Sequence, residues 1–302
     1  MKSIIIVLGL GLTLSFGPTQ AEPVMVETFQ GSVSVETSPH STYVYDMAAL
    51  DTLDALGVEN ITSIGKTYLP YLAQYQGDAG TLFEPDFEAV YAAKPDLVIV
   101  GGRSLEHLVA MHRIAPTIDM TIWGHDLVGQ AFARLHSYGE LYDRADRAVQ
   151  LQRQVELAMV ETAAAVAGKG TGLILMTNGP KVSAYGSGSR FGWIYSATGL
   201  SEAVVGLEDT VHGQAVSFEF IKEVNPDWLL VIDRVAAIGA EGTNARQTLD
   251  NPLVRQTRAW ASGNVIYLDA ARVYIAAGGV QSILGTLETI RTGFSAANTS
   301  HE

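Results

Sequence analysis

Two stretches of the chain repeat one pattern: FEAVYAAKPDLVIVGGR at residues 87–103 and FEFIKEVNPDWLLVIDR at residues 218–234. Each begins with Phe-Glu, continues to a Pro-Asp pair and an apolar run, and ends in arginine, all in the same register. The pattern predicts a short helix, a break at Pro-Asp and then a buried strand, because the apolar run is continuous rather than alternating. The two copies indicate a chain with two α/β lobes.

The repeated arginines, Arg103 and Arg234, stand at the carboxyl ends of their predicted strands. Open α/β sheets bind ligands at that edge, so two lobes can place two cations face to face across a cleft. A third, Arg190, follows a Gly/Ser loop after another predicted strand. Guanidinium groups are always charged and donate several hydrogen bonds, which favours an anion with several oxygens. The alternative is local pairing, for example of Arg234 with Asp233.

The bulk composition describes a globular protein that does not bind nucleic acid. The chain has 302 residues, of which 47% are hydrophobic and 17% charged, enough for two substantial cores. Its formal net charge is −13, whereas nucleic-acid binding needs a basic face. An anionic ligand therefore requires a pocket whose local charge opposes that of the whole molecule.

The first residues have the features of an export signal. Lys2 supplies a short positive region, Ile4–Phe16 an apolar stretch, and Ala21 a small residue suited to cleavage, so we expect a signal peptide over residues 1–21. The chain contains no cysteine, which excludes a lipid-modified cysteine and thiol chemistry. These features predict a mature protein that is free in the periplasm.

The remaining sequence divides into a lobe at 22–138, a connecting helix at 139–168 and a second lobe at 169–302. Between residues 139 and 167 the composition favours one long helix, which would join the lobes rigidly and permit only slight closure of the cleft. We also expect a helix at 244–261 and a terminal helix at 279–294. In the first lobe we expect strands at 24–35, 43–45, 61–64 and 117–123.

Two further pairs of residues stand out in predicted loops and helix starts. Glu88 and Glu219 open the two repeated helices, where a carboxylate favours the helix dipole and could also flank the cleft rim for a basic partner. His212 lies in a polar loop and Tyr274 between a strand and the last helix. Imidazole and phenolate can bind iron, but a loop histidine and a half-buried tyrosine are also common without such a role.

Taken together, several segments of the chain resemble one known family. These segments are LDAL at 53–56, DFEAV through VGGR at 86–103, SAYGSGSRFG at 183–192, HGQAVSFEFI at 212–221, VIDR at 231–234 and YIAAG at 274–278. They resemble the periplasmic ferric-siderophore-binding proteins of ABC iron importers, in the branch that binds catecholates such as enterobactin. The resemblance implies two doubly wound α/β lobes joined by one long α-helix, the class III periplasmic binding protein fold.

The resemblance also implies roles for individual residues. Arg103, Arg190 and Arg234 match the arginines that hold the trianionic ferric tris-catecholate in that branch. His212 and Tyr274 match the residues that complete the iron coordination when a tetradentate ligand leaves two sites open. The iron(III) would be carried within the ligand, and no intrinsic cofactor is expected.

The two glutamates and two aromatic residues complete the expected site. Glu88 and Glu219 match the family's contacts with the membrane permease. Catechol rings can stack on arginine, and we expect Tyr185 and Trp193 to offer further aromatic faces. The resemblance implies a monomeric binding protein without catalytic activity.

Other classes of protein remain as alternatives at this stage. A haem- or cobalamin-binding protein of the same fold could use His212 or Tyr274 as an axial ligand, although three arginines exceed the needs of haem's propionates. An exported hydrolase would need a nucleophile motif, and the sequence contains no Gly-x-Ser-x-Gly elbow. A zinc-uptake protein would favour a histidine-rich loop, whereas the 7 histidines are spread along the chain.

Overall fold

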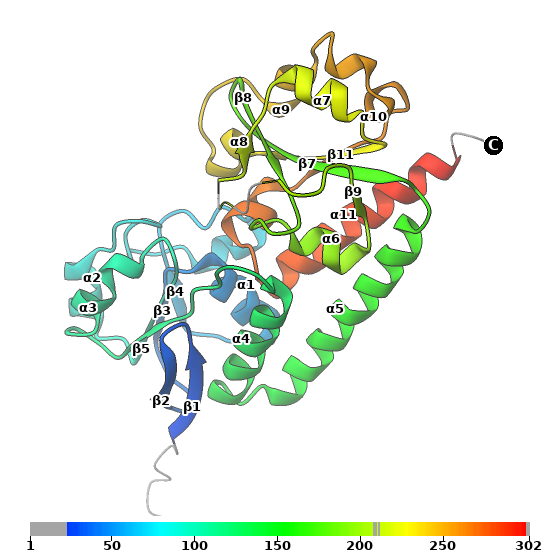
Figure 1. The fold of residues 1–302 in the computed structure, drawn as a ribbon. Helices are drawn as coiled ribbons and strands as arrows, with labels where there is room; N and C mark the ends of the chain where they lie inside the picture. Colours follow the sequence, from blue (N-terminus) through cyan, green and yellow to red (C-terminus); the bar gives the residue numbers. More distant parts are fainter. Residues whose placement is uncertain (1–22, 208–209, 211, 300–302) are drawn as a thin grey trace, which may run out of the picture.

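The computed structural model describes residues 23–207, 210 and 212–299, and these form two α/β lobes (Figure 1). The helix α5 (Ala145–Val166) runs along one side of the molecule from one lobe to the other, with the last helix beside it. The expected signal peptide, residues 1–21, lies outside the described residues. Among the helices that are described, none is long and apolar enough to cross a membrane.

The N-terminal lobe is built on a parallel sheet in the strand order β4-β3-β5-β6. Its strands are β3 (Thr42–Val44), β4 (Ile61–Ser63), β5 (Leu97–Val100) and β6 (Thr117–Asp119). Its helices are α1 (Met47–Leu56), α2 (Phe87–Ala93), α3 (Leu108–Met111) and α4 (Leu127–Leu141), with short turns η1 (Pro70–Tyr75) and η2 (Leu105–His107). The stretch expected as one strand at 24–35 is an antiparallel hairpin, β1 (Pro23–Thr28) and β2 (Gly31–Glu36), and β1 packs on α4.

The C-terminal lobe holds a mixed sheet in the order β10-β8-β7-β11-β12, with β9 beside β7. Its strands are β7 (Thr171–Asn178), β8 (Lys181–Tyr185), β9 (Ser201–Glu202), β10 (Gln214–Ala215), β11 (Trp228–Asp233) and β12 (Val265–Leu268). Its helices are α6 (Trp193–Thr198), α7 (Phe218–Val224), α8 (Arg234–Ile238), α9 (Ala245–Leu249), α10 (Arg258–Ala261) and α11 (Val280–Thr299), with turns η3 (Val254–Gln256) and η4 (Ala271–Ile275). β8 runs antiparallel to both of its neighbours, β7 and β10.

The repeated sequence forms the same unit in both lobes, α2 followed by β5 and α7 followed by β11. The Pro-Asp carboxylates have equivalent partners. Asp96 Oδ2 accepts the backbone N–H of His40 at 2.8 Å, and Asp227 Oδ2 accepts that of Thr171 at 2.8 Å. Each bond ties the start of the repeated strand to the start of the first strand of its own sheet. The Pro-Asp motif therefore has a structural role in both lobes, in addition to preceding the strand that ends near the arginine.

The connecting helix begins later than the sequence predicts. The expected helix from residue 139 is two helices, because α4 ends at Leu141, Asp143 adopts φ 54° in the turn, and α5 starts at Ala145. Gly139 belongs to α4, where a Cβ would come within 2.8 Å of Ala148 Cβ on α5. Glycine at this position thus permits close packing of α4 on α5 instead of starting a helix.

The prediction of one helix at 244–261 is also wrong, because this segment too is broken into shorter elements. The structure has α9, the turn η3 and α10 in its place, with Pro252 in the break. Proline has no N–H to continue the helical ladder. Asn251 Oδ1 accepts the N–H of Leu253 at 2.8 Å, which satisfies a backbone donor in the break. The terminal helix is confirmed as α11, and the strand expected at 117–123 ends at Asp119.

A buried carboxylate joins the two lobes beside the connecting helix. Asp51 on α1 is fully buried and accepts the backbone N–H of Gln281 at 2.7 Å and the hydroxyl of Ser282 at 2.8 Å, both in the first turn of α11. The hydroxyl of Tyr71 donates to the same carboxylate at 2.5 Å. Asp51 therefore caps a helix that begins in the other lobe, directly after the segment that carries Tyr274.

Candidate ligand-binding site

The three arginines singled out in the sequence converge on the side chain of Tyr274, which lies in η4. Their guanidinium carbons lie 5.3 Å (Arg103), 4.6 Å (Arg190) and 5.9 Å (Arg234) from the centre of its ring. Arg103 follows β5 of the N-terminal lobe, whereas Arg190 and Arg234 belong to the C-terminal lobe. The fold thus brings cations from both lobes to one point, as the repeated strand ends suggest.

Hydrogen bonds fix this cluster across the boundary between the lobes. Arg103 donates to the backbone carbonyls of Tyr274 at 2.6 Å and Ile275 at 3.2 Å. Arg190 donates to the same Tyr274 carbonyl at 3.4 Å. Arg234 Nε donates to the Tyr274 hydroxyl at 3.2 Å. The tyrosine is therefore held at both its main chain and its phenol by positively charged groups.

The clustered charges change the acidity of the groups involved. Burial alone would raise the pKa of Tyr274, but the hydrogen bond from Arg234 and the charges of Arg190 and Arg103 outweigh it, so this pKa lies below its ordinary value. Burial lowers the pKa of Arg190, and the like charge of Arg103 lowers it further. The site therefore favours negative charge, in a protein whose net charge is −13.

Three adjoining cavities surround the cluster, and Arg190 lines all of them. The cavity on the C-terminal lobe has a volume of about 340 Å³ and is lined by Met176, Asn178, Lys181, Ser183, Tyr185, Arg190, His212, Arg234 and Tyr274. The other two, of about 180 and 260 Å³, reach the N-terminal lobe through Ile122 and Trp123. Together they form a cleft between the lobes with the arginine cluster at its centre.

The remaining residues expected at the site differ in where they lie. His212 is exposed and lines the same cavity as Tyr274. Tyr185 is buried and lines that cavity too, but its hydroxyl donates to the carbonyl of His212 at 2.8 Å, and burial raises its pKa to about 12. Tyr185 thus supports the histidine loop. Trp193 is packed in the core on α6, and the cavities found around the cluster in the described residues do not include it.

Two cleft residues were missed at the sequence level, Trp123 and His125. The sequence predicts a strand through residue 123, but β6 ends at Asp119 and the chain turns into the cleft before α4. Gly124 and Asp126 both have positive φ, of 78° and 59°. The run Gly-His-Asp after the tryptophan is the signal that would have predicted this turn.

The two predicted docking residues occupy equivalent places on opposite lobes. Glu88 lies in the first turn of α2 and Glu219 in the first turn of α7, and both side chains are exposed. Figure 1 shows α2 and α7 at the outer parts of the two lobes. The Glu219 pKa is lowered by its own backbone N–H and by the hydroxyl of Ser217. Neither glutamate is sequestered by the fold.

The described residues do not form a binding site for a resident metal ion. Within these residues, no group of three or more His, Asp or Glu side chains is arranged to hold a metal ion. His212 and Tyr274 line one cavity as two separate donors.

The fold and the cleft define a substrate-binding protein of two lobes. The chain belongs to the periplasmic binding protein family, whose model matches residues 43–271. Proteins of this family bind substrates outside the cytoplasmic membrane, for transport across it, and are not enzymes. The hydrolase alternative is therefore excluded. The predicted fold class, two α/β lobes joined by a long helix, is confirmed.

Particular relatives carry names that specify their ligands. The petrobactin-binding protein YclQ of Bacillus subtilis is 34% identical over 272 residues, covering 87% of this chain and 85% of its own. The ferric-anguibactin-binding protein FatB of Vibrio anguillarum is 30% identical over 286 residues, covering 90% and 88%. The solved periplasmic catecholate-siderophore binding protein VctP of Vibrio cholerae has a TM-score of 0.80 and 31% identity, covering 91% of this chain and all of the other, 100%.

Proposed function

We propose that this protein captures a ferric catecholate siderophore outside the cytoplasmic membrane and delivers it to the permease of an ABC importer. The observation that carries the proposal is the convergence of three guanidinium groups from both lobes on one point of the cleft. The class of ligand is suggested by the names of the relatives, since VctP is named for catecholate siderophores, FatB for ferric anguibactin and YclQ for petrobactin.

The charge of the site suits a ferric complex of three catecholate groups, which is trianionic. Arg103, Arg190 and Arg234 offset three negative charges, and Lys181 is a further cation in the cavity that Arg190 and Arg234 line. The half-buried position of the arginines strengthens each charge-assisted hydrogen bond relative to water. Guanidinium planes can also lie against catechol rings, which a compact ammonium group does less well.

His212 and Tyr274 are proposed to bind the iron directly when the siderophore is tetradentate. A phenolate oxygen is a hard donor that suits iron(III), and imidazole also suits iron. The lowered pKa of Tyr274 makes the phenolate easier to form at neutral pH, and His212 lines the same cavity. The iron would then arrive and leave within the ligand, as cargo.

Glu88 and Glu219 are proposed to dock the two lobes on basic sockets of the permease. Both are exposed, and each lies on a different lobe at the start of a repeated helix. Replacing both by glutamine should leave siderophore affinity unchanged and abolish uptake in cells that depend on this protein. Loss of siderophore affinity in that variant would contradict the docking role.

The finer points of export and organisation belong to the same proposal. We infer cleavage of a signal peptide after Ala21, no lipid anchor, and a monomer whose two lobes are joined by α5. Mass spectrometry of the exported protein tests the cleavage site and the lipid together.

A titration of the purified protein with ferric catecholates tests the proposed function. Micromolar hexadentate complex should quench the intrinsic fluorescence, and Arg190→Gln should weaken binding by about tenfold or more through a lost charge-assisted bond. Arg153→Gln on the exposed side of α5 is the matched control and should bind as the parent does. Absence of binding by the parent protein would overturn the proposal.

A second titration separates iron coordination from electrostatics. Replacing His212 and Tyr274 together by alanine and phenylalanine should weaken tetradentate complexes far more than hexadentate ones, because only the former leave iron sites open. Equal losses for the two kinds of complex would refute direct coordination.

A further inference from the structure

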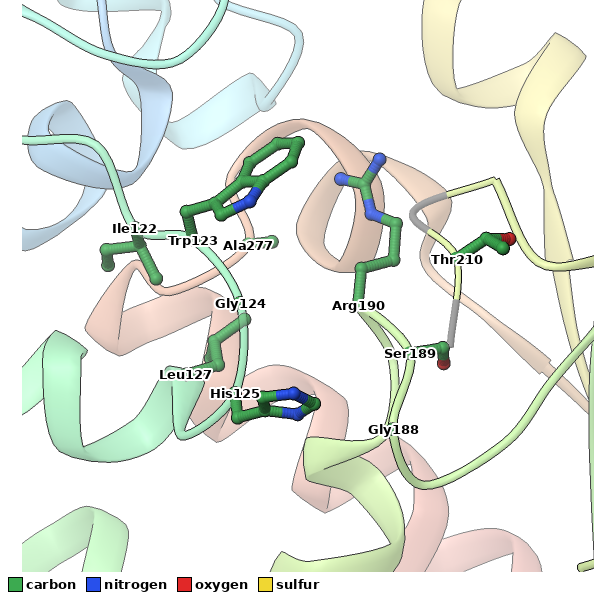
Figure 2. A pocket seen from close by; sticks show the side chains of 10 residues that line it. All are labelled: Ile122, Trp123, Gly124, His125, Leu127, Gly188, Ser189, Arg190, Thr210 and Ala277. Atoms are coloured by element: carbon green, nitrogen blue, oxygen red, sulfur yellow. The ribbon is translucent and has the colours of Figure 1, made fainter. Parts of the chain in front are cut away.

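Trp123 is a large aromatic side chain left exposed at the mouth of the cleft. It lies between β6 and α4, and 56% of its surface is accessible. Figure 2 shows its indole and the guanidinium of Arg190 on facing sides of one cavity, one from each lobe. His125, on the same loop, extends toward Gly188 and Ser189 of the opposite lobe. An exposed tryptophan in this position has no role in the core.

The loop that carries Trp123 is held in place by one side chain of α4. Gln130 Oε1 accepts the N–H of Trp123 at 3.1 Å, and its Nε2 donates to the carbonyls of Trp123 at 2.9 Å and His125 at 2.8 Å. Gly124 and Asp126 supply the two positive φ angles that the turn requires. The backbone under the exposed indole is therefore fixed before any ligand arrives, which reduces the entropy lost on binding.

The space beside the indole has the size and lining that an aromatic ring needs. Trp123 and Arg190 line both the cavity of about 260 Å³ and that of about 180 Å³, and Arg103 and Tyr274 line the smaller one. A cavity of about 150 Å³ is enough to hold benzene. Indole and guanidinium both present flat faces on which a ring can stack.

We propose that Trp123 and Arg190 form a subsite for one aromatic ring of the chelating ligand. The ring enters between the indole and the guanidinium, and the imidazole of His125 contacts its polar substituents. This inference rests on the proposed function and deepens it, because it assigns part of the ligand selectivity to a residue of the N-terminal lobe. The subsite favours chelators built on aromatic rings over chelators of equal charge that lack them.

Three substitutions at one position distinguish ring stacking from general apolar contact. With a ferric tris-catecholate as ligand in isothermal titration calorimetry, Trp123→Phe should keep affinity within about threefold, because a ring remains. Trp123→Leu and Trp123→Ala should each lose roughly tenfold, because the stacking face is gone. The thermal midpoint of all three should match the parent, since the side chain is exposed. Trp260→Phe, on α10 away from the cleft, is the matched control and should bind normally.

Two results would overturn the subsite while leaving the proposed function intact. One is an unchanged affinity of Trp123→Ala, and the other is equal affinities of the leucine and phenylalanine variants, provided that the parent binds the complex. Failure of the parent protein to bind any ferric catecholate would instead remove the proposed function, and the subsite with it.

Discussion

The carboxylate that joins the lobes gives the protein a pH-dependent stability that one substitution should remove. Burial raises the pKa of Asp51 to about 6, against an ordinary value of 3.8, although hydrogen bonds from Tyr71, Ser282 and Gln281 act in the opposite direction. Because the folded-state pKa is the higher one, the folded state holds a proton between about pH 4 and pH 6 that the unfolded state has lost. The free energy of unfolding should therefore fall as the pH rises through this window.

The size of the effect follows from the difference between the two pKa values. At about 1.4 kcal/mol for each unit, Asp51 should remove about 3 kcal/mol of stability between pH 4 and pH 7. Asp51→Asn cannot ionise, yet its amide can still accept the N–H of Gln281. The variant should resemble the parent at pH 4 and exceed the parent's stability by about 3 kcal/mol at pH 7, because it carries no buried charge.

Urea unfolding at pH 4, 5, 6 and 7 and constant ionic strength measures this difference. Subtracting the two curves isolates Asp51 from the other acidic groups, which are common to both proteins. Asp146→Asn in the exposed first turn of α5 is the matched control and should follow the parent closely. A difference between Asp51→Asn and the parent that stays constant with pH would refute a raised pKa at this position.

Three further predictions concern the site and the framework. Tyr274 should ionise below the ordinary tyrosine pKa in an ultraviolet titration, and Tyr274→Phe should lack this ionisation step. Arg234→Gln should move the step to higher pH, because a positive charge and a hydrogen-bond donor to the phenol are lost. A step that does not move in Arg234→Gln would contradict the assignment. Asp96→Asn and Asp227→Asn should each cost about 1–3 kcal/mol in urea unfolding, since a charged acceptor is lost, and a cost in only one lobe would show that the repeats are not equivalent. Leu287 on α11 is fully buried, so Leu287→Ala should lower the free energy of unfolding by about 2–5 kcal/mol. A smaller loss would indicate that the surrounding residues collapse around the smaller side chain.

The sequence predicts the fold best where local chemistry decides the structure. The units α2–β5 and α7–β11 follow from a continuous apolar run and a Pro-Asp break, both visible in a few neighbouring residues. The positions of Arg103 and Arg234 at the cleft follow as well, because the carboxyl ends of parallel strands meet at one edge.

The sequence fails where the structure depends on contacts between distant segments. Gly139 resembles a helix boundary, but its role is to let α4 approach Ala148 on α5. Trp193 was expected to offer an aromatic face to the ligand, yet it is packed in the core on α6. Trp123 is a different case, because the turn that places it in the cleft has a local signal in Gly124 and Asp126, and Gln130 on α4 then holds the loop.

The contacts that hold the arginine cluster together are the contacts that a ligand must replace. Arg103 crosses the boundary between the lobes to bond two carbonyls of the Tyr274 segment, and Lys66 crosses it to the carbonyl of Ile238 at 3.1 Å. A bound anion competes with these carbonyls for Arg103. The binding affinity therefore reflects the difference between the hydrogen bonds that the ligand makes to Arg103 and those that the carbonyls lose. Among the described residues, those of the Asp51 junction and of α5 do not line the three cavities around the cluster. Adjustment on binding should therefore fall on the arginines and the Tyr274 segment, while the junction between the lobes stays fixed.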